Sequence, residues 1–214
     1  MSQPAFSNDT PTDGSTASRN LSTNPVVILI VGLFAILLVW ALQPAKQFGQ
    51  GETHPGVGQA MGSFQLAPLL GDTAPVTLES VRGDVVLINF WGTWCGPCLM
   101  EFPHLIEMND RLKGHERFRF VPVSCGPGGA EVDAEQLQAE TQSYLAKLDA
   151  DLNVYSDPDT GARLSVVKAA QLSGFSYPTT VLLDRDGIIR ALWQGYRPGV
   201  EAEMEEAIKA LLKS

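Results

Sequence analysis

The sequence predicts an α/β fold, a mixed central sheet flanked by helices, preceded by one N-terminal transmembrane helix. Three observations carry this prediction. Val85 to Phe90 is a continuous apolar run with β-branched residues, which is typical of a strand buried on both faces. Strand-like and helical segments alternate after it, and two late strands flank Asp184-Arg185-Asp186-Gly187, a strong signal for an antiparallel hairpin. Finally, the apolar run from Val26 to Leu42 contains no charged residue.

The elements of the domain follow from periodicity and from stop signals. Asp133 is a suitable N-cap for one helix, and Lys113-Gly114 ends another. Pro122 lacks a backbone donor within the second strand, so we expect a bulge or a broken ladder there. In chain order the prediction is a strand over 85–90, a helix over 97–112, a strand over 118–123, a helix over 134–148, an extended piece at 154–155, a helix over 160–170, strands over 179–183 and 188–193, and a helix over 200–212.

The N-terminal part of the chain divides by composition. Residues 1–24 are rich in Ser, Thr, Asn and Asp and predict a disordered tail. The apolar run predicts a transmembrane helix over residues 25–43, at the lower end of the about 17–25 residues that span a bilayer. Residues 44–62 are rich in Gly, Gln and Pro, which suits a flexible linker. The folded domain is therefore expected over residues 63–214.

Two alternatives compete with a membrane anchor. A buried core helix would show a polar face, and the apolar run has none. A cleaved signal peptide would end in small residues, whereas Gln43-Pro44-Ala45-Lys46 follows here. The sequence therefore favours an uncleaved anchor. Arg19 and Lys46 lie on opposite sides of the run, so charge alone does not set its orientation.

The net charge of the chain is −9, which disfavours binding to the phosphate backbone of nucleic acids. The chain has three cysteines, and an odd number argues against a purely structural disulfide framework. Cys95 and Cys98 form a C-x-x-C pair, whose short loop constrains the unfolded chain very little. The cysteine pair must therefore have a chemical role, either redox exchange or metal binding.

The C-x-x-C pair follows a buried strand and opens a helix. At a helix start, unpaired N–H groups and the helix dipole stabilise a thiolate on Cys95. Cys98 lies one turn further along, where it can attack a mixed disulfide formed at Cys95. Pro97 is tolerated in the first turn, and Trp91 and Trp94 are expected to supply an apolar rim. A zinc site would need two further ligands, and the remaining cysteine and histidines show no ligand spacing.

The stretch Trp91-Gly92-Thr93-Trp94-Cys95-Gly96-Pro97-Cys98 resembles the active site of the thioredoxin superfamily, and most closely its membrane-tethered TlpA/ResA-type branch. Asn89, six residues before the first cysteine, and Glu101-Phe102-Pro103 also match that branch. Tyr177-Pro178-Thr179-Thr180 resembles the cis-proline segment of the family, and residues 134–175 fit the helix and strand that the branch inserts. The resemblance covers the chain from about Ser63 to its end.

The resemblance implies roles for particular residues. Cys95 and Cys98 are catalytic, and a substrate is bound by Trp94, Gly96, Pro97, Tyr177 and Pro178. Without the resemblance, Pro178 would be taken for a trans-proline starting an edge strand. Glu101 lies one helical turn after Cys98 and could exchange protons with that thiol; the alternative is an ordinary solvated carboxylate.

Cys125 ends the second strand, and the carboxyl ends of such strands form the functional edge of an open sheet. Cys125 is therefore expected on the same rim as Cys95, either as a third reactive thiol or as a free, half-buried cysteine.

The resemblance implies a thiol–disulfide oxidoreductase that reduces disulfides in extracytoplasmic proteins and needs no cofactor. It also implies a transmembrane electron donor of the DsbD/CcdA type and oxidised apocytochrome c as a candidate substrate, in cytochrome c maturation. The alternative is a copper-binding or copper-delivery module on the same fold, with His104 as the histidine ligand. A peroxidase is not indicated, because peroxiredoxins place Thr or Ser three residues before the reactive cysteine, where this chain has Gly92.

Overall fold

The computed structural model describes residues 25–41, 50–127 and 133–214. The chain forms two compact units, Met1–Lys46 and Gln47–Ser214. In the first unit, α1 (Pro25–Ala41) is the predicted apolar helix. Among the helices in the described part of the chain, none is long and apolar enough to cross a membrane. The predicted tail and residues 44–49 of the predicted linker lie outside the described residues.

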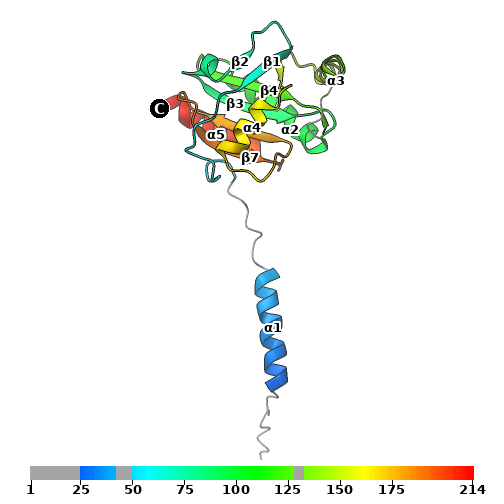
Figure 1. The fold of residues 1–214 in the computed structure, drawn as a ribbon, viewed down its shortest axis with the longest axis vertical. Coiled ribbons are helices and arrows are strands. Elements are labelled where there is room, and N and C mark those ends of the chain that lie inside the picture. Colours follow the sequence, from blue (N-terminus) through cyan, green and yellow to red (C-terminus); the bar gives the residue numbers. More distant parts are fainter. Residues whose placement is uncertain (1–24, 42–49, 128–132) are drawn as a thin grey trace, which may run out of the picture. The chain divides into compact units, whose positions relative to one another are not determined.

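Within the described residues, seven strands of the second unit form a single sheet in the order β2-β1-β5-β4-β3-β6-β7 (Figure 1). β3 runs parallel to β4 and antiparallel to β6, so the sheet is mixed, as predicted. The elements are β1 (Gln65–Leu70), β2 (Val76–Thr77), the 3-10 helix η1 (Glu79–Val81), β3 (Val85–Trp91), α2 (Gly96–Leu112), β4 (Phe118–Ser124), α3 (Ala134–Lys147), β5 (Val154–Ser156), α4 (Gly161–Ala169), β6 (Thr179–Leu183), β7 (Ile189–Gln194) and α5 (Val200–Lys213).

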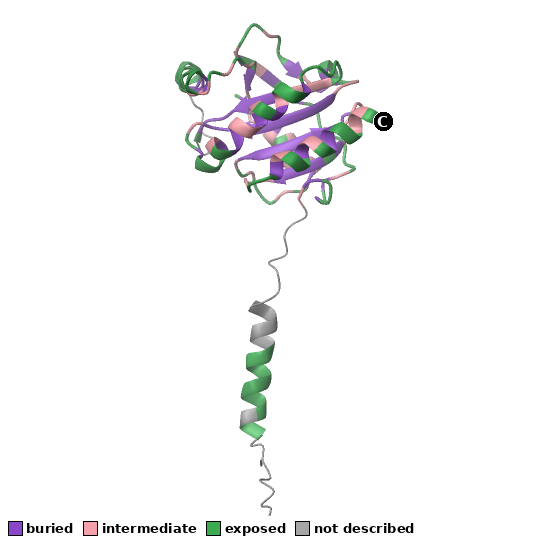
Figure 2. Ribbon diagram, turned by 180° about the vertical axis from the view of Figure 1, so that it is seen from behind, coloured by how far each residue is buried: buried purple, intermediate pink, exposed green. Residues whose placement is uncertain are grey.

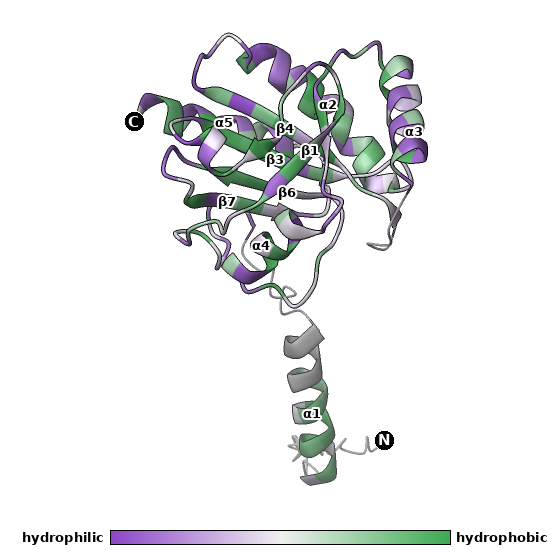
Figure 3. Ribbon diagram, turned by 45° about the horizontal axis from the view of Figure 1, so that its top comes forward, coloured by the Kyte–Doolittle hydropathy of each residue, from purple (hydrophilic) through white to green (hydrophobic). Residues whose placement is uncertain are grey.

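The central strand β3 is buried along its whole length and divides the core into two layers (Figure 2). Val85 and Leu87 pack in a cluster with residues of α2 and α5. Val86, Ile88 and Phe90 point the other way and pack in a cluster that includes residues of α4. Because side chains alternate along a strand, a strand that is buried on both faces needs helices on both sides of the sheet. Figure 3 shows the hydrophobic strands between these helices.

The predicted elements from 85 to 212 are all present, with bounds that differ by at most two residues. Two short strands and η1 were not predicted. β1 contains Pro68, which breaks the apolar pattern, and its ladder with β5 is irregular between Pro68 and Leu70. The expected irregularity at Pro122 is absent, because β3 and β4 pair in continuous register. β5 pairs only with Val123 and Ser124 of β4, so Pro122 lies just outside that ladder.

The predicted flexible linker is wrong for residues 50–62, which pack on the domain. Gly51 and Ala60 form isolated bridges with Leu192 and Ile188, and the backbone N–H of Met61 donates to the carbonyl of Gly187 at 3.0 Å. This segment runs along β7, the last strand of the sheet, and satisfies donors and acceptors that an exposed edge would leave free. The domain therefore begins before Ser63.

Candidate active site

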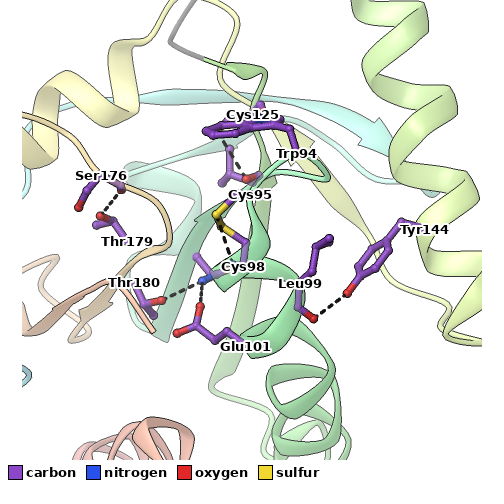
Figure 4. Close-up of a disulfide and its surroundings, with 12 residues drawn as sticks. Trp94, Cys95, Cys98, Leu99, Glu101, Cys125, Tyr144, Ser176, Thr179 and Thr180 are labelled. Atoms are coloured by element: carbon purple, nitrogen blue, oxygen red, sulfur yellow. Dashed lines mark hydrogen bonds between the residues drawn. A yellow bond between two sulfur atoms is a disulfide. The ribbon is translucent and has the colours of Figure 1, made fainter. Parts of the chain in front are cut away.

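The two cysteines lie where β3 ends and α2 begins, and they are joined by a disulfide (Figure 4). Cys95 is the N-cap of α2, and its Sγ accepts a hydrogen bond from the backbone N–H of Cys98 at 3.3 Å. An N–H group that has no helical partner thus points at the sulfur, which stabilises a thiolate there. Gly96 and Pro97 are exposed, whereas Cys98 is fully buried. Substrate therefore reaches Cys95 more readily than Cys98.

Trp94 folds back over the carboxyl end of β4. Its indole Nε1 donates to the carbonyl oxygen of Cys125 at 2.8 Å, yet 42% of the residue remains exposed. Gly92 makes this arrangement possible, because a Cβ at that position would lie 2.4 Å from the indole nitrogen and 2.6 Å from the Cys125 oxygen. Trp91 is fully buried, so the prediction that it belongs to the rim is wrong, and Trp94 alone of the two places an aromatic surface next to the disulfide.

The Tyr177–Pro178 peptide bond is cis, as the resemblance implies. Pro178 is buried and directly precedes β6, whose first residue, Thr179, pairs with Phe90 near the end of β3. The ring of Tyr177 meets that of Trp94 edge to face, with centroids 5.2 Å apart. The structure thus brings the two sequence segments predicted to bind substrate to one edge of the sheet.

Glu101 is not the solvated carboxylate of the alternative prediction, since only 1% of the residue is exposed. Asn89 Nδ2 donates to Glu101 Oε2 at 3.0 Å and to Thr180 Oγ1 at 2.8 Å (Figure 4). Asn89 and Thr180 are directly opposed on β3 and β6, on the face that α2 covers. Burial raises the pKa of the Glu101 carboxyl from 4.5 to about 7, although the hydrogen bond from Asn89 opposes the shift.

Cys125 lies at the expected rim, because the preceding residue, Ser124, pairs with Trp91 at the end of β3. It forms no disulfide and is buried. Burial raises the pKa of the Cys125 thiol to about 12, so the thiolate is scarce at neutral pH. Cys125 is therefore a free, buried cysteine rather than a third reactive thiol.

Sequence reasoning missed a polar cluster beside the cis-proline segment. Arg163 Nε donates to Asp157 Oδ2 at 3.0 Å, and Arg163 Nη1 donates to the hydroxyl of Tyr177 at 2.7 Å. Asp157 also accepts from the backbone N–H groups of Ala162 and Arg163 and so anchors the start of α4. The turn Asp157-Pro158-Asp159 was recognisable in the sequence, but its partners were not, because no motif relates residues brought together by the fold.

Residues 25–41, 50–127 and 133–214 contain no group of three or more His, Cys, Asp and Glu side chains placed to hold a metal ion. His104, the histidine of the copper alternative, lies on α2 six residues after Cys98 and is half-buried. No contact of His104 in the described residues favours the copper alternative.

The buried carboxyl of Glu101 should make stability depend on pH. Its pKa is higher in the folded than in the unfolded chain, so its contribution to stability is full below pH 4.5 and is lost as pH rises to about 7. Glu101→Gln keeps an acceptor for Asn89 without the charge. We expect this variant to exceed the parent in unfolding free energy by up to about 3 kcal/mol at pH 8, with little difference at pH 4.

Urea unfolding of the oxidised proteins at both pH values measures this difference. Glu107→Gln is the matched control, since Glu107 is exposed on the same helix and should show no such pH dependence. An equal effect of Glu101→Gln on the unfolding free energy at pH 4 and pH 8 would contradict the raised pKa of the Glu101 carboxyl in the folded protein.

The chain is similar to proteins of known family. The AhpC/TSA family profile matches residues 57–192. The thioredoxin-like protein YneN of Bacillus subtilis is 28% identical over 82% of this chain and 95% of its own length. The thiol-disulfide oxidoreductase ResA of Bacillus cereus is 24% identical over 84% of this chain and 95% of its own.

Solved structures agree with the sequence relatives. A Chlorobium tepidum protein assigned as the thiol:disulfide interchange protein DsbE has 30% identity and a TM-score of 0.56, and the match covers 73% of this chain and 97% of that one. The mixed sheet, the disulfide at the start of α2 and the cis-proline beside it match the expectations for this branch. The chain therefore belongs to the AhpC/TSA family and is a thioredoxin-like protein of the TlpA/ResA type.

Proposed function

We propose that this thiol–disulfide oxidoreductase reduces disulfides in extracytoplasmic proteins through the Cys95/Cys98 dithiol. The observation that carries the proposal is the Cys95–Cys98 disulfide at the start of α2, with the backbone N–H of Cys98 pointing at Cys95 Sγ. That geometry stabilises a thiolate at the more accessible end of the pair. Cys95 is therefore the nucleophile, and Cys98 is the resolving thiol.

The exchange occurs in two steps. The Cys95 thiolate attacks one sulfur of the substrate disulfide, forms a mixed disulfide and releases the other substrate sulfur as a thiolate. Cys98 then loses its proton and attacks Cys95 Sγ, which forms the Cys95–Cys98 disulfide and releases the second substrate thiol. Two electrons pass from the dithiol to the substrate, so a dithiol electron donor must reduce the protein again.

Reduction is favoured over disulfide formation by the surroundings of Cys95. A strong oxidant depends on extra positive charge that stabilises its thiolate, and residues 91–101 contain no Lys, Arg or His. Arg163, which contacts the neighbouring Tyr177, is paired with Asp157. The Cys95 thiolate is therefore stabilised mainly by the helix start.

We expect a reduction potential nearer about −270 mV, as in thioredoxin, than about −120 mV, as in a strong periplasmic oxidant. Equilibration with glutathione measures it, and Cys125→Ala is the control that should leave it unchanged because Cys125 is outside the dithiol. A value above about −180 mV would reverse the proposed direction.

We further propose that Glu101 accepts the proton of Cys98. The carboxyl is buried one helical turn after Cys98, and its pKa of about 7 suits proton exchange near neutral pH. The hydrogen bond from Asn89 fixes its orientation, while its second oxygen, Oε1, has no partner among the described residues. Glu101 is thus held in place with one oxygen available for a proton.

Glu101→Gln should therefore slow the second exchange step by about 100-fold and the first step much less, because Gln cannot accept the proton. An aromatic disulfide that releases one coloured thiol per step separates the two rates in stopped-flow measurements. Glu107→Gln, on the exposed side of α2, should change neither rate. Equal slowing of both steps by Glu101→Gln would rule out this role.

We also propose that residues 25–43 anchor the protein in the membrane, with the tail cytoplasmic and the domain extracytoplasmic. α1 contains no charged residue, and its Leu29, Val31 and Phe34 side chains are exposed, an arrangement suited to lipid rather than water. In that setting a membrane donor of the DsbD/CcdA type supplies the electrons, and oxidised apocytochrome c is a candidate substrate.

A phosphatase reporter that is active only outside the cytoplasm, fused after Ser214, should be active. A β-galactosidase fusion at the same point, which is active only in the cytoplasm, should be inactive. The opposite pattern would reverse the proposed orientation.

A further inference from the structure

The two helices that share one face of the sheet begin at the same edge. β3 and β7 both run antiparallel to β6, so they are parallel to each other, and α2 and α5 follow them in the chain. Leu105 of α2 and Val200 of α5 belong to one buried cluster. Glu101 lies one helical turn before Leu105. Glu201 directly follows Val200, so both carboxyl groups belong to the same end of the contact between α2 and α5.

Each of these two carboxyl groups has a buried oxygen without a hydrogen-bond partner. Among the described residues, the two atoms are Glu101 Oε1 and Glu201 Oε2. Burial is the main cause of the raised pKa of Glu101, and the negative charge of Glu201 raises this pKa as well. Tyr196, which connects β7 to α5, has a pKa raised by desolvation and by the charges of Glu201 and Glu101. The three acidic side chains therefore lie near one another where α2 meets α5.

No cation offsets the charge of Glu201 at this place. Within residues 50–127 and 133–214, neither Glu101 nor Glu201 forms an ion pair with Lys, Arg or His. β3 and β6 contribute neutral polar groups beside Glu101. The pKa of Arg111 is raised chiefly by its hydrogen bonds to Glu205 and only lastly by the charge of Glu201. The charge of Glu201 therefore acts on Glu101 without compensation.

We propose that Glu201 is a positioning residue for proton transfer in disulfide exchange, because its carboxylate strengthens Glu101 as the base that receives the proton of Cys98. In the second exchange step this proton passes from Cys98 Sγ to the Glu101 carboxylate, which becomes a neutral acid. A negative charge nearby favours the neutral acid over the carboxylate, so the transfer is easier with Glu201 in place. The inference rests on the proposed role of Glu101 and names the residue that sets the strength of this base.

The first test follows the Glu101 carboxyl itself, by NMR of the oxidised full-length protein with carboxyl-labelled Glu in detergent micelles. The Glu101 signal is the one that Glu101→Gln removes. Glu201→Gln should lower the titration midpoint of this signal by about half a pH unit, the size expected when a like charge is lost from a partly screened site. Glu201→Asp keeps the charge and should retain most of the parent midpoint. Glu206→Gln removes a charge from the exposed side of α5 and should leave the midpoint unchanged.

The second test measures the rate of the second exchange step against pH in the same variants. This rate should rise with pH as Glu101 loses its proton, and Glu201→Gln should move the midpoint of the rise to lower pH by the same amount as in the NMR titration. The rate above the midpoint should fall about 2-fold, because a weaker base accepts the proton less readily. The rate of the first step should not change in Glu201→Gln.

An unchanged Glu101 midpoint in Glu201→Gln, or an equal shift in Glu206→Gln, would overturn the role of Glu201 while leaving the disulfide exchange intact. A second step whose rate in the parent protein does not follow the Glu101 titration would overturn Glu101 as the proton acceptor, and the role of Glu201 with it. A parent protein that does not react with the aromatic disulfide would overturn the exchange reaction itself.

Discussion

The junction between β3 and α2 is the constraint on which the rest of the site depends. β3 is buried on both faces, so its course is fixed by the core, and the chain must turn sharply after Trp91 to start a helix at Gly96. The N-cap of that helix is Cys95, whose sulfur receives an N–H group that the helix cannot pair internally. The redox chemistry therefore follows from a helix start held at a rigid sheet edge.

The sequence contained enough information to predict the elements from 85 to 212, because β3 and the hairpin at Asp184–Gly187 have strong local patterns. β1 and β2 lack such patterns: Pro68 interrupts one, and the other has two residues. The covering of β7 by residues 50–62 was not predictable from composition. A Gly- and Pro-rich sequence suits a flexible linker as well as it suits a segment packed on a sheet edge. Only tertiary contacts such as that of Gly51 with Leu192 distinguish the linker from the packed segment.

Within the site, the cysteines, Trp94 and the cis-proline segment were recognisable because they form contiguous motifs. The surroundings of Glu101 were not, since Asn89 and Thr180 meet it only through the register of β3 with β6. The same holds for the contact of Arg163 with Tyr177, which depends on where α4 packs against the sheet. Sequence motifs thus identified the reacting groups, while tertiary contacts determine their pKa values and their neighbours.

The buried carboxyl shows how function and stability oppose each other here. A core with an apolar side chain in place of Glu101 would avoid the cost of ionisation above pH 7, although Asn89 Nδ2 would then lose one of its two acceptors. The protein instead holds an acid in the layer between α2 and the sheet, beside the helix turn that carries Cys98. Such an arrangement destabilises the folded state at neutral pH, which is a reason to expect that its proton takes part in the exchange reaction.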